Sequence, residues 1–214
     1  MNFISHRGNN KNNLEENTID IISETLKYKY ISGVEFDIRF TKDKKIILYH
    51  NMLINIKGKY SFVKLANYKE ILKYNPSICL LDNLLNEIKT DKILLIEIKE
   101  ESDNYIEFIN KIYTILKKYN FNYYICSFNY DLLMDMKKRY NKFKYGLIIG
   151  YLMNINKITS DFDFYLYKDN YLKYIDENKE IFIFNINNRE QLKKILTKIN
   201  YNCYIITDKA YLFN

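Results

Sequence analysis

The segment from Phe3 to Asn51 carries four motifs: FISHRG at residues 3–8, EENT at 15–18, GVEFDIRFT at 33–41 and IILYHN at 46–51. It contains both histidines of the chain, His6 and His50, and each follows a short apolar run that is typical of a β-strand. Between them lie Glu35 and Asp37, two residues apart in a third such run. Side chains two apart in a strand point to the same face, so the sequence predicts two carboxylates projecting together.

Two interpretations of this carboxylate pair are open. Carboxylates on one face repel each other unless a positive charge lies between them, and a divalent cation fits because hard metals prefer oxygen ligands. Alternatively, Glu35 and Asp37 are only the solvated face of an amphipathic strand, and the histidines are incidental. The residues alone do not decide between the two.

Further strands are indicated along the whole chain. Eight core strands are predicted, at residues 3–5, 34–40, 93–98, 123–127, 145–149, 162–167, 181–186 and 204–206. A further strand at 46–49 forms a hairpin with the second of them. The strand at 93–98 is apolar almost throughout, as expected for a strand buried on both faces, and only Glu97 and Lys99 interrupt its end.

Helical patterns separate these strands. The predicted helices lie at residues 19–30, 67–74, 82–89, 105–119, 130–140, 171–177 and 188–199. Asn17 and Thr18 are suitable N-caps for the first helix, and Asn188 with Gln191 forms a capping box for the last. We expect residues 52–63 to be irregular, and a short crossing segment to precede the strand at 162–167.

Alternating strands and helices indicate a parallel α/β fold, either a (β/α)8 TIM barrel or a doubly wound sheet. Periodicity alone does not separate the two. In a barrel, however, chemistry gathers at the carboxyl ends of the strands. The charged and imidazole residues singled out lie at or near such ends: His6, Arg7, Glu35, Asp37, His50, Glu97 and Lys99. We therefore predict a compact (β/α)8 barrel.

Length and composition agree with one domain spanning residues 1–214. At 48% hydrophobic residues the chain can bury one sizeable core, and it contains no Pro/Gly/Ser-rich linker. The net charge of +7 fits an anionic partner such as nucleic acid, a lipid surface or a phosphorylated substrate. The lysines are interleaved with acids and no nucleic-acid-binding module is recognisable, which argues against nucleic acid.

The three cysteines, Cys79, Cys126 and Cys203, are far apart and lack CxxC spacing. They indicate neither a disulfide framework nor a zinc site, and we expect buried, inert thiols in a reducing compartment. No segment approaches the length of a membrane span. The first predicted strand begins at Phe3, which leaves no room for a signal peptide, so we expect a soluble, cytoplasmic protein.

The order of HRG, ENT, ExD, a strand ending in histidine, and IEIK at residues 96–99 resembles the glycerophosphodiester phosphodiesterase family. The resemblance extends to IFIFNIN at 181–187 and IITD at 205–208, and so covers nearly the whole chain. Phosphatidylinositol-specific phospholipases C and spider-type sphingomyelinases D share the barrel but fit these spacings less well. Each motif is weak alone, but five in the same order are specific.

The resemblance implies a function and a set of roles. A divalent ion, Mg²⁺ or Ca²⁺, would be held by Glu35, Asp37 and Glu97. Arg7 and Lys99 would bind the substrate phosphate, and His6 and His50 would be the catalytic acid and base. The reaction implied is hydrolysis of glycerophosphodiesters, small-molecule substrates derived from phospholipids, to glycerol 3-phosphate and an alcohol.

The chain departs from the family pattern at three positions. Asn51 replaces the aspartate that usually follows the second histidine, Phe184 replaces a tryptophan, and Glu15 replaces a proline. None of these changes removes an implied ligand, so an active but divergent member is expected. Two alternatives are a lipid-acting enzyme cleaving lysophospholipids, with residues 52–63 as its apolar rim, and a catalytically silent barrel that binds phosphorylated ligands.

Overall fold

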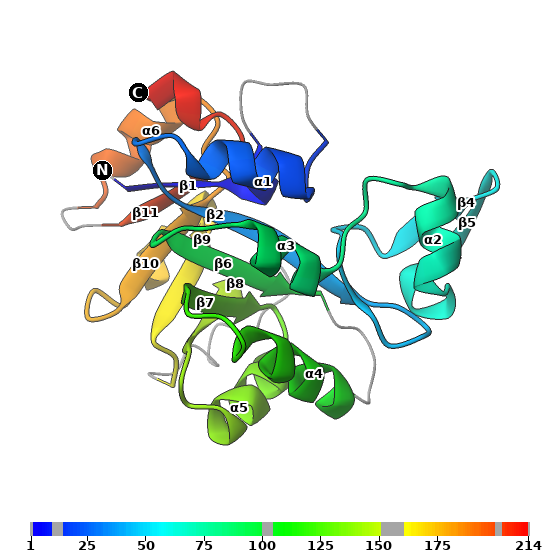
Figure 1. The fold of residues 1–214 in the computed structure, drawn as a ribbon. Helices are drawn as coiled ribbons and strands as arrows, with labels where there is room; N and C mark the ends of the chain where they lie inside the picture. Colours follow the sequence, from blue (N-terminus) through cyan, green and yellow to red (C-terminus); the bar gives the residue numbers. More distant parts are fainter. Residues whose placement is uncertain (1, 10–14, 100–104, 151–160, 200–202, 214) are drawn as a thin grey trace.

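Eight parallel strands form a closed barrel in the computed structural model, which describes residues 2–9, 15–99, 105–150, 161–199 and 203–213 (Figure 1). The barrel strands are β1 (Asn2–Ser5), β2 (Ile31–Phe40), β6 (Ile93–Ile98), β7 (Asn122–Ser127), β8 (Lys144–Ile149), β9 (Phe164–Lys168), β10 (Glu180–Phe184) and β11 (Tyr204–Thr207). Each pairs in parallel with its neighbours, and β1 pairs with both β11 and β2. This closure confirms the barrel and excludes an open doubly wound sheet.

Helices surround the barrel on the outside: α1 (Ile19–Leu26), α3 (Leu81–Glu87), α4 (Ile106–Leu116), α5 (Tyr130–Arg139) and α6 (Arg189–Leu196) (Figure 1). Side-chain caps fix where three of them begin. Thr18, Asn129 and Asn188 accept hydrogen bonds from backbone N–H groups of the first turns of α1, α5 and α6. The N-cap predicted at Asn188 is thus confirmed, but the predicted box is not closed on Asn188, because the Gln191 side chain accepts from the backbone N–H of Asn187 instead.

Strand alternation produces two separate apolar layers. On β6, Leu94, Ile96 and Ile98 pack outward against the helices, whereas Ile93 and Leu95 face the barrel interior. The interior layer consists of Ile4, Ile93, Leu95, Tyr124, Cys126, Ile148, Phe164, Leu166, Phe182 and Ile206. The strand at 93–98 is therefore buried on both faces, as its continuous apolar sequence predicts.

Two predicted segments differ from the structure. Residues 169–174 form a 3₁₀ helix rather than the α-helix expected at 171–177. Residues 52–63 are not irregular, because β4 (Leu53–Ile56) and β5 (Lys59–Phe62) pair as an antiparallel hairpin. The crossing segment expected before β9 falls on residues 151–160, outside the described residues.

A small satellite core lies beside the barrel. It joins the β4–β5 hairpin to α2 (Tyr68–Tyr74) through Ile54, Ile56 and Ile71, and it reaches the barrel at Ile47 of β3 (Ile46–Leu48). Figure 1 shows the hairpin and α2 projecting to one side of the barrel. Because β3 pairs antiparallel to β2, it positions this projection near the carboxyl end of β2.

All three cysteines are free and buried, in agreement with the prediction of inert thiols. Burial raises the pKa of the Cys79 thiol to about 12, so the reactive thiolate is scarce near neutral pH. Among the described residues, no helix has the length and apolar character needed to cross a membrane.

Candidate active site

Three carboxylates meet at the carboxyl ends of β2 and β6. The outward side chains of β2 include Val34, Phe36 and Ile38, so Glu35 and Asp37 point inward together. The parallel register sets Asp37 opposite Glu97 of β6. One oxygen from each of Glu35, Asp37 and Glu97 lies within 4.8 Å of the others.

These three carboxylates have the donor set of a divalent cation site. Each has one buried oxygen, Glu35 Oε1, Asp37 Oδ1 and Glu97 Oε1, whose only partner among the described residues is at most the Lys99 ammonium. Lys99 Nζ forms ion pairs with two of these atoms, at 2.5 Å from Glu97 and 3.3 Å from Asp37, while Glu35 Oε1 has no such partner. Buried acceptors without a donor are costly, and a hard cation satisfies them, so the residues fit a divalent ion.

Crowding shifts the pKa values of the three carboxyls in different directions. Burial and the nearby charge of Asp37 raise the pKa of Glu35 to about 8, and burial also raises the pKa of Glu97. Burial alone would raise the pKa of Asp37 as well. The charges of Lys99 and His50 outweigh that effect, so the pKa of Asp37 falls below its usual value.

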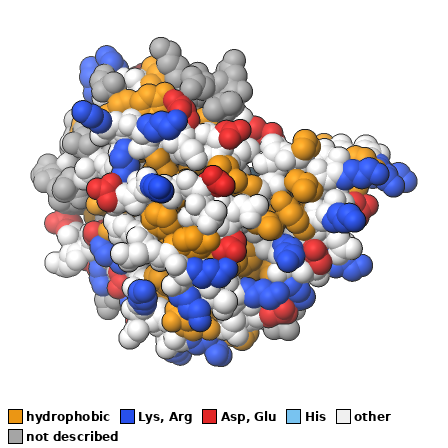
Figure 2. All heavy atoms as spheres, viewed as in Figure 1, with side chains coloured by type: hydrophobic (Ala, Val, Ile, Leu, Met, Phe, Trp, Pro, Cys, Tyr) orange, Lys and Arg blue, Asp and Glu red, His pale blue; other side chains and the backbone are white. Residues whose placement is uncertain are grey.

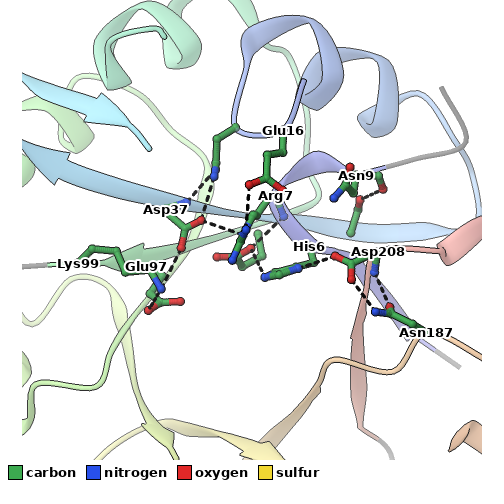
Figure 3. Close-up of polar contacts among 12 residues, drawn as sticks. His6, Arg7, Asn9, Glu16, Asp37, Glu97, Lys99, Asn187 and Asp208 are labelled. Atoms are coloured by element: carbon green, nitrogen blue, oxygen red, sulfur yellow. Dashed lines mark hydrogen bonds and ion pairs between the residues drawn. The ribbon is translucent and has the colours of Figure 1, made fainter. Parts of the chain in front are cut away.

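Arg7 is placed by an unusual backbone turn after β1. Arg7 and Gly8 have φ values of 54° and 72°, in the left-handed region, and a Cβ on Gly8 would come within 3.0 Å of Ile21 and Ile22. This turn directs the Arg7 backbone N–H to Glu35 Oε2 at 2.9 Å. The guanidinium ion-pairs with Glu16 at 2.8 Å and lies 3.3 Å from Asp37 (Figure 3).

His6 lies between acidic groups on two sides. Its Nδ1 hydrogen-bonds Asp208 Oδ1 at 2.6 Å, and its Nε2 lies 3.9 Å from Glu35 Oε2 (Figure 3). Asn187 holds Asp208 in turn, donating from Nδ2 to Oδ2 at 2.5 Å and accepting the Asp208 backbone N–H at 2.8 Å. Burial lowers the pKa of His6, but the Asp208 hydrogen bond and the Glu35 charge outweigh it and the pKa is raised.

His50 follows β3 and is held by Arg39 and Asn51. Arg39 donates from Nε and Nη2 to the His50 carbonyl oxygen at 2.9 and 2.7 Å, and from Nη1 to the Lys99 carbonyl oxygen at 3.0 Å. The His50 ring bonds through Nδ1 to Asn51 Oδ1 at 3.0 Å, so Asn51 orients the imidazole without a negative charge. Burial lowers the pKa of His50.

Several site residues lie outside the set that the sequence singles out. Asn17 does not cap α1; Thr18 does, and Asn17 instead exchanges two hydrogen bonds with Asp37, at 2.9 Å to its side chain and 3.0 Å from its backbone N–H. Asp208, Asn187 and Arg39 also belong to the site. The IITD motif marks Asp208 as a strand-end carboxylate, but nothing in the sequence pairs it with His6.

The cleft above these residues has two unlike walls. Its volume is about 160 Å³, and its polar wall contains His6, Arg7, Glu35, His50, Glu97 and Lys99. The rest of the lining is mostly apolar and consists of Phe128, Ile148, Leu166, Phe184 and Ile206, together with the polar Asn185. Among the described residues that line it there is no serine, threonine or cysteine.

In enzymes with an eight-stranded α/β barrel, the active site lies at the carboxyl ends of the strands. This cleft lies at the same end of the barrel, so the fold and the site together define the protein as a barrel enzyme. Residues 6–154 match the glycerophosphoryl diester phosphodiesterase family. This match covers more than half of the chain, and the chain belongs to that family. The resemblance seen in the motifs is confirmed.

Solved structures agree on the fold. A glycerophosphodiester phosphodiesterase from Thermotoga maritima is similar at 24% identity, with a TM-score of 0.78 and coverage of 99% of this chain and 96% of the other. One from Parabacteroides distasonis has 17% identity, a TM-score of 0.81 and coverage of 96% and 92%. An Oleispira antarctica phosphodiesterase in complex with the product sn-glycerol-3-phosphate has 16% identity, a TM-score of 0.77 and coverage of 97% and 93%. No curated protein matches the chain.

Proposed function

We propose that this protein is a metal-dependent phosphodiesterase that hydrolyses glycerophosphodiesters to glycerol 3-phosphate and an alcohol. The observation that carries the proposal is the triad of buried carboxylates, with one oxygen of each within 4.8 Å of the others, and two of these carboxylates line one cleft with both histidines. Family membership supplies the reaction class. The Oleispira antarctica protein, whose structure holds sn-glycerol-3-phosphate, supports the product.

Glu35, Asp37 and Glu97 would hold the ion, Mg²⁺ or Ca²⁺. Such an ion neutralises charge on the phosphodiester and makes its phosphorus easier to attack. Arg7 and Lys99 flank the carboxylates and would bind the remaining phosphate oxygens, the first through its planar fork and the second as a point charge.

The two histidines would perform the proton transfers. His6 and His50 lie on different elements but line the same cleft, so one imidazole can accept a proton while the other donates one. Asp208 fixes the ring of His6 and Asn51 fixes the ring of His50. Each hydrogen bond is made by Nδ1, which leaves Nε2 of each ring for the substrate.

The attacking group would come from the substrate itself. The described residues lining the cleft offer no hydroxyl or thiol, and Ser5 Oγ donates to the Asn9 backbone oxygen at 2.5 Å. The hydroxyl beside the phosphorylated carbon of glycerol is already close to phosphorus, which gives it an effective molarity that bulk water lacks. Its attack breaks the bond to the leaving alcohol and forms a cyclic phosphate, which water then opens to glycerol 3-phosphate.

Two other functions compete with this one. A silent barrel that binds phosphorylated ligands has no need of two histidines that are each oriented by a side-chain partner. A lysophospholipid-cleaving enzyme would use the same site on a larger substrate. Its expected apolar rim at residues 52–63 does contain exposed apolar side chains, including Tyr60 and Phe62.

The test is the release of glycerol 3-phosphate from a panel of glycerophosphodiesters and lysophospholipids by the full chain. The proposal predicts turnover of the water-soluble diesters at rates above those of the lysophospholipids. Binding of the diesters without turnover would identify a silent barrel, and turnover of lysophospholipids alone would identify the lipid enzyme. We further propose that residues 1–214 act as one domain and that the protein works in the cytoplasm.

A further inference from the structure

An exposed apolar and basic surface lies on the β4–β5 hairpin, which we define with its flanking residues as the 52–65 hairpin. Eight large hydrophobic side chains are exposed among the described residues, and five of them belong to this short segment: Met52, Leu53, Tyr60, Phe62 and Leu65. Tyr60 is 74% exposed and Leu65 is 61% exposed. Such clustering on one segment marks an interaction site, whereas scattered single residues would not.

The hairpin has one buried face and one face without a partner. Ile54 and Ile56 point inward to α2 and the satellite core. Strand alternation then turns Leu53 and Asn55 to the other face. The antiparallel register sets Phe62 opposite Leu53 and Tyr60 opposite Asn55, so these exposed side chains form one continuous surface.

The same segment is strongly basic. Lys57, Lys59 and Lys64 are exposed, and residues 52–65 contain no acidic residue. No ion pair with a described residue involves any of the three, although many other lysines of the chain are paired. Figure 2 shows the projection that carries the hairpin with basic side chains at its outer end and apolar ones closer to the barrel.

This surface continues to the active-site cleft. Met52 and Phe62 line a small cavity together with Arg39 and Lys99, and Lys99 also lines the cleft itself. The exposed ring of Phe128, which also lines the cleft, lies with its centroid 5.9 Å from the Lys99 ammonium. Exposed apolar side chains of the hairpin and of Phe128 are thus linked to the cleft through Lys99.

We propose that the 52–65 hairpin is a docking element for anionic lipid surfaces. Aromatic and aliphatic side chains next to lysines are suited to the boundary between lipid headgroups and acyl chains. The exposed lysines of the segment add attraction to anionic headgroups. A second copy of the chain is a poorer occupant, because two such basic surfaces would repel each other and a single hairpin is small for a stable interface.

Docking places the mouth of the barrel at the lipid surface. Binding to the surface does not require hydrolysis, so it can be tested separately from the proposed reaction.

The first test is sedimentation of the full chain with vesicles of phosphatidylcholine alone or mixed with phosphatidylglycerol. We expect binding to the mixed vesicles only, and we expect Lys57→Glu/Lys59→Glu to weaken it about tenfold or more, because each of the two lysines near an anionic surface contributes roughly fivefold. The matched control is Lys193→Glu/Lys194→Glu, which makes the same charge change on exposed residues of α6. Equal loss in both variants would show attraction by net charge alone and would overturn the proposal.

The second test follows insertion. The chain contains no tryptophan, so Tyr60→Trp introduces a single tryptophan at the hairpin, whose fluorescence can be excited apart from that of the tyrosines, and Leu196→Trp introduces one on α6 as a control. We expect the emission of Tyr60→Trp to shift to shorter wavelength with the mixed vesicles, and that of Leu196→Trp to stay unchanged. Absence of a shift at Tyr60, or an equal shift at both positions, would overturn the proposal.

Two further measurements distinguish loss of lipid docking from loss of catalysis and from dimer formation. Lys57→Glu/Lys59→Glu should hydrolyse a water-soluble glycerophosphodiester at the wild-type rate, because neither lysine lines the cleft. Lost binding with retained hydrolysis supports lipid docking. A concentration-dependent dimer that Tyr60→Ser dissociates would assign the surface to a second copy and contradict the lipid proposal.

Discussion

Asp208 contributes to the site through one contact, its hydrogen bond to the His6 ring. Its carboxylate bonds His6 Nδ1 at 2.6 Å and is itself held by Asn187. A histidine fixed in this way presents Nε2 to the cleft in one orientation. Under the proposed function, Asp208 would therefore be a positioning residue for His6, although it does not line the cleft.

We predict that Asp208→Asn lowers kcat for glycerophosphodiester hydrolysis about tenfold or more, because general acid–base catalysis requires a correctly oriented ring. KM should change little, since the phosphate-binding side chains are untouched. Steady-state kinetics would measure both, with Glu190→Gln, an exposed position on α6, as the control. A rise in KM with unchanged kcat would show that Asp208 serves substrate binding instead.

The two histidines should behave as a unit. His6→Ala and His50→Ala are each expected to lower kcat by about a hundredfold or more, the scale of a general acid or base. The double variant should be little worse than either single one, because neither proton transfer succeeds alone. Near-normal turnover by His50→Ala would contradict the assignment of the two histidines as an acid and base pair. The hydrogen bond between Asn51 and the His50 ring would then have no catalytic role.

At the scale of single elements, the contact between β2 and β6 determines where the carboxylates lie. Gly33 begins the part of β2 that pairs with β6, opposite Ile93. A Cβ at Gly33 would lie 2.4 Å from the Ile93 carbonyl oxygen and 2.7 Å from its Cβ. The strands can approach this closely only because residue 33 has no side chain.

We predict that Gly33→Ala lowers the free energy of unfolding by about 1–3 kcal/mol or more, the usual cost of forcing extra volume into a packed interior. The neighbouring Ser32→Ala is the control, because the one hydrogen bond from its hydroxyl to a described residue is long, 3.5 Å to Asn2. Chemical denaturation followed by circular dichroism measures both. Equal stability of Gly33→Ala and Ser32→Ala would show that the barrel relaxes freely at this position.

Strand alternation explains why part of the site was predictable from the sequence. Glu35 and Asp37 share a face because they are two apart in a strand, and Glu97 stands out as the one carboxylate in an apolar run. The hairpin at residues 52–63 was missed, although Leu53 to Ile56 alternates between exposed and buried positions. Each of its strands is only four residues long, and the sequence does not show the satellite core that buries Ile54 and Ile56.

At the scale of the whole molecule, barrel closure creates contacts that no local pattern contains. His6 and Asp208 are 202 residues apart and meet only because β1 pairs with β11. Asn17 turns to Asp37 through a left-handed backbone with φ of 57°, whereas its position before a helix is typical of a cap. Eight strands and the barrel could thus be predicted from the sequence, but the side chains that orient the site residues could not.

The chemical route of the reaction depends on how the whole cleft holds the substrate. If the neighbouring hydroxyl of the glycerol attacks phosphorus, a substrate analogue that lacks this hydroxyl should bind but turn over at least about tenfold more slowly. Phosphorus NMR early in the reaction with the natural diester should detect cyclic glycerophosphate. Equal rates for the two compounds, with no cyclic species, would favour direct attack by water.

The account depends most on a divalent ion held by three carboxylates. Titration calorimetry of the full chain with Mg²⁺ or Ca²⁺ after chelation, with release of glycerol 3-phosphate measured at each step, tests this directly. We predict that one ion binds per chain and that activity rises in proportion to the occupancy of the site. Glu97→Gln should lose both ion binding and activity but stay folded, with a thermal melting temperature that matches that of the metal-free wild type. Full turnover after exhaustive chelation, or an active Glu97→Gln, would contradict the metal site.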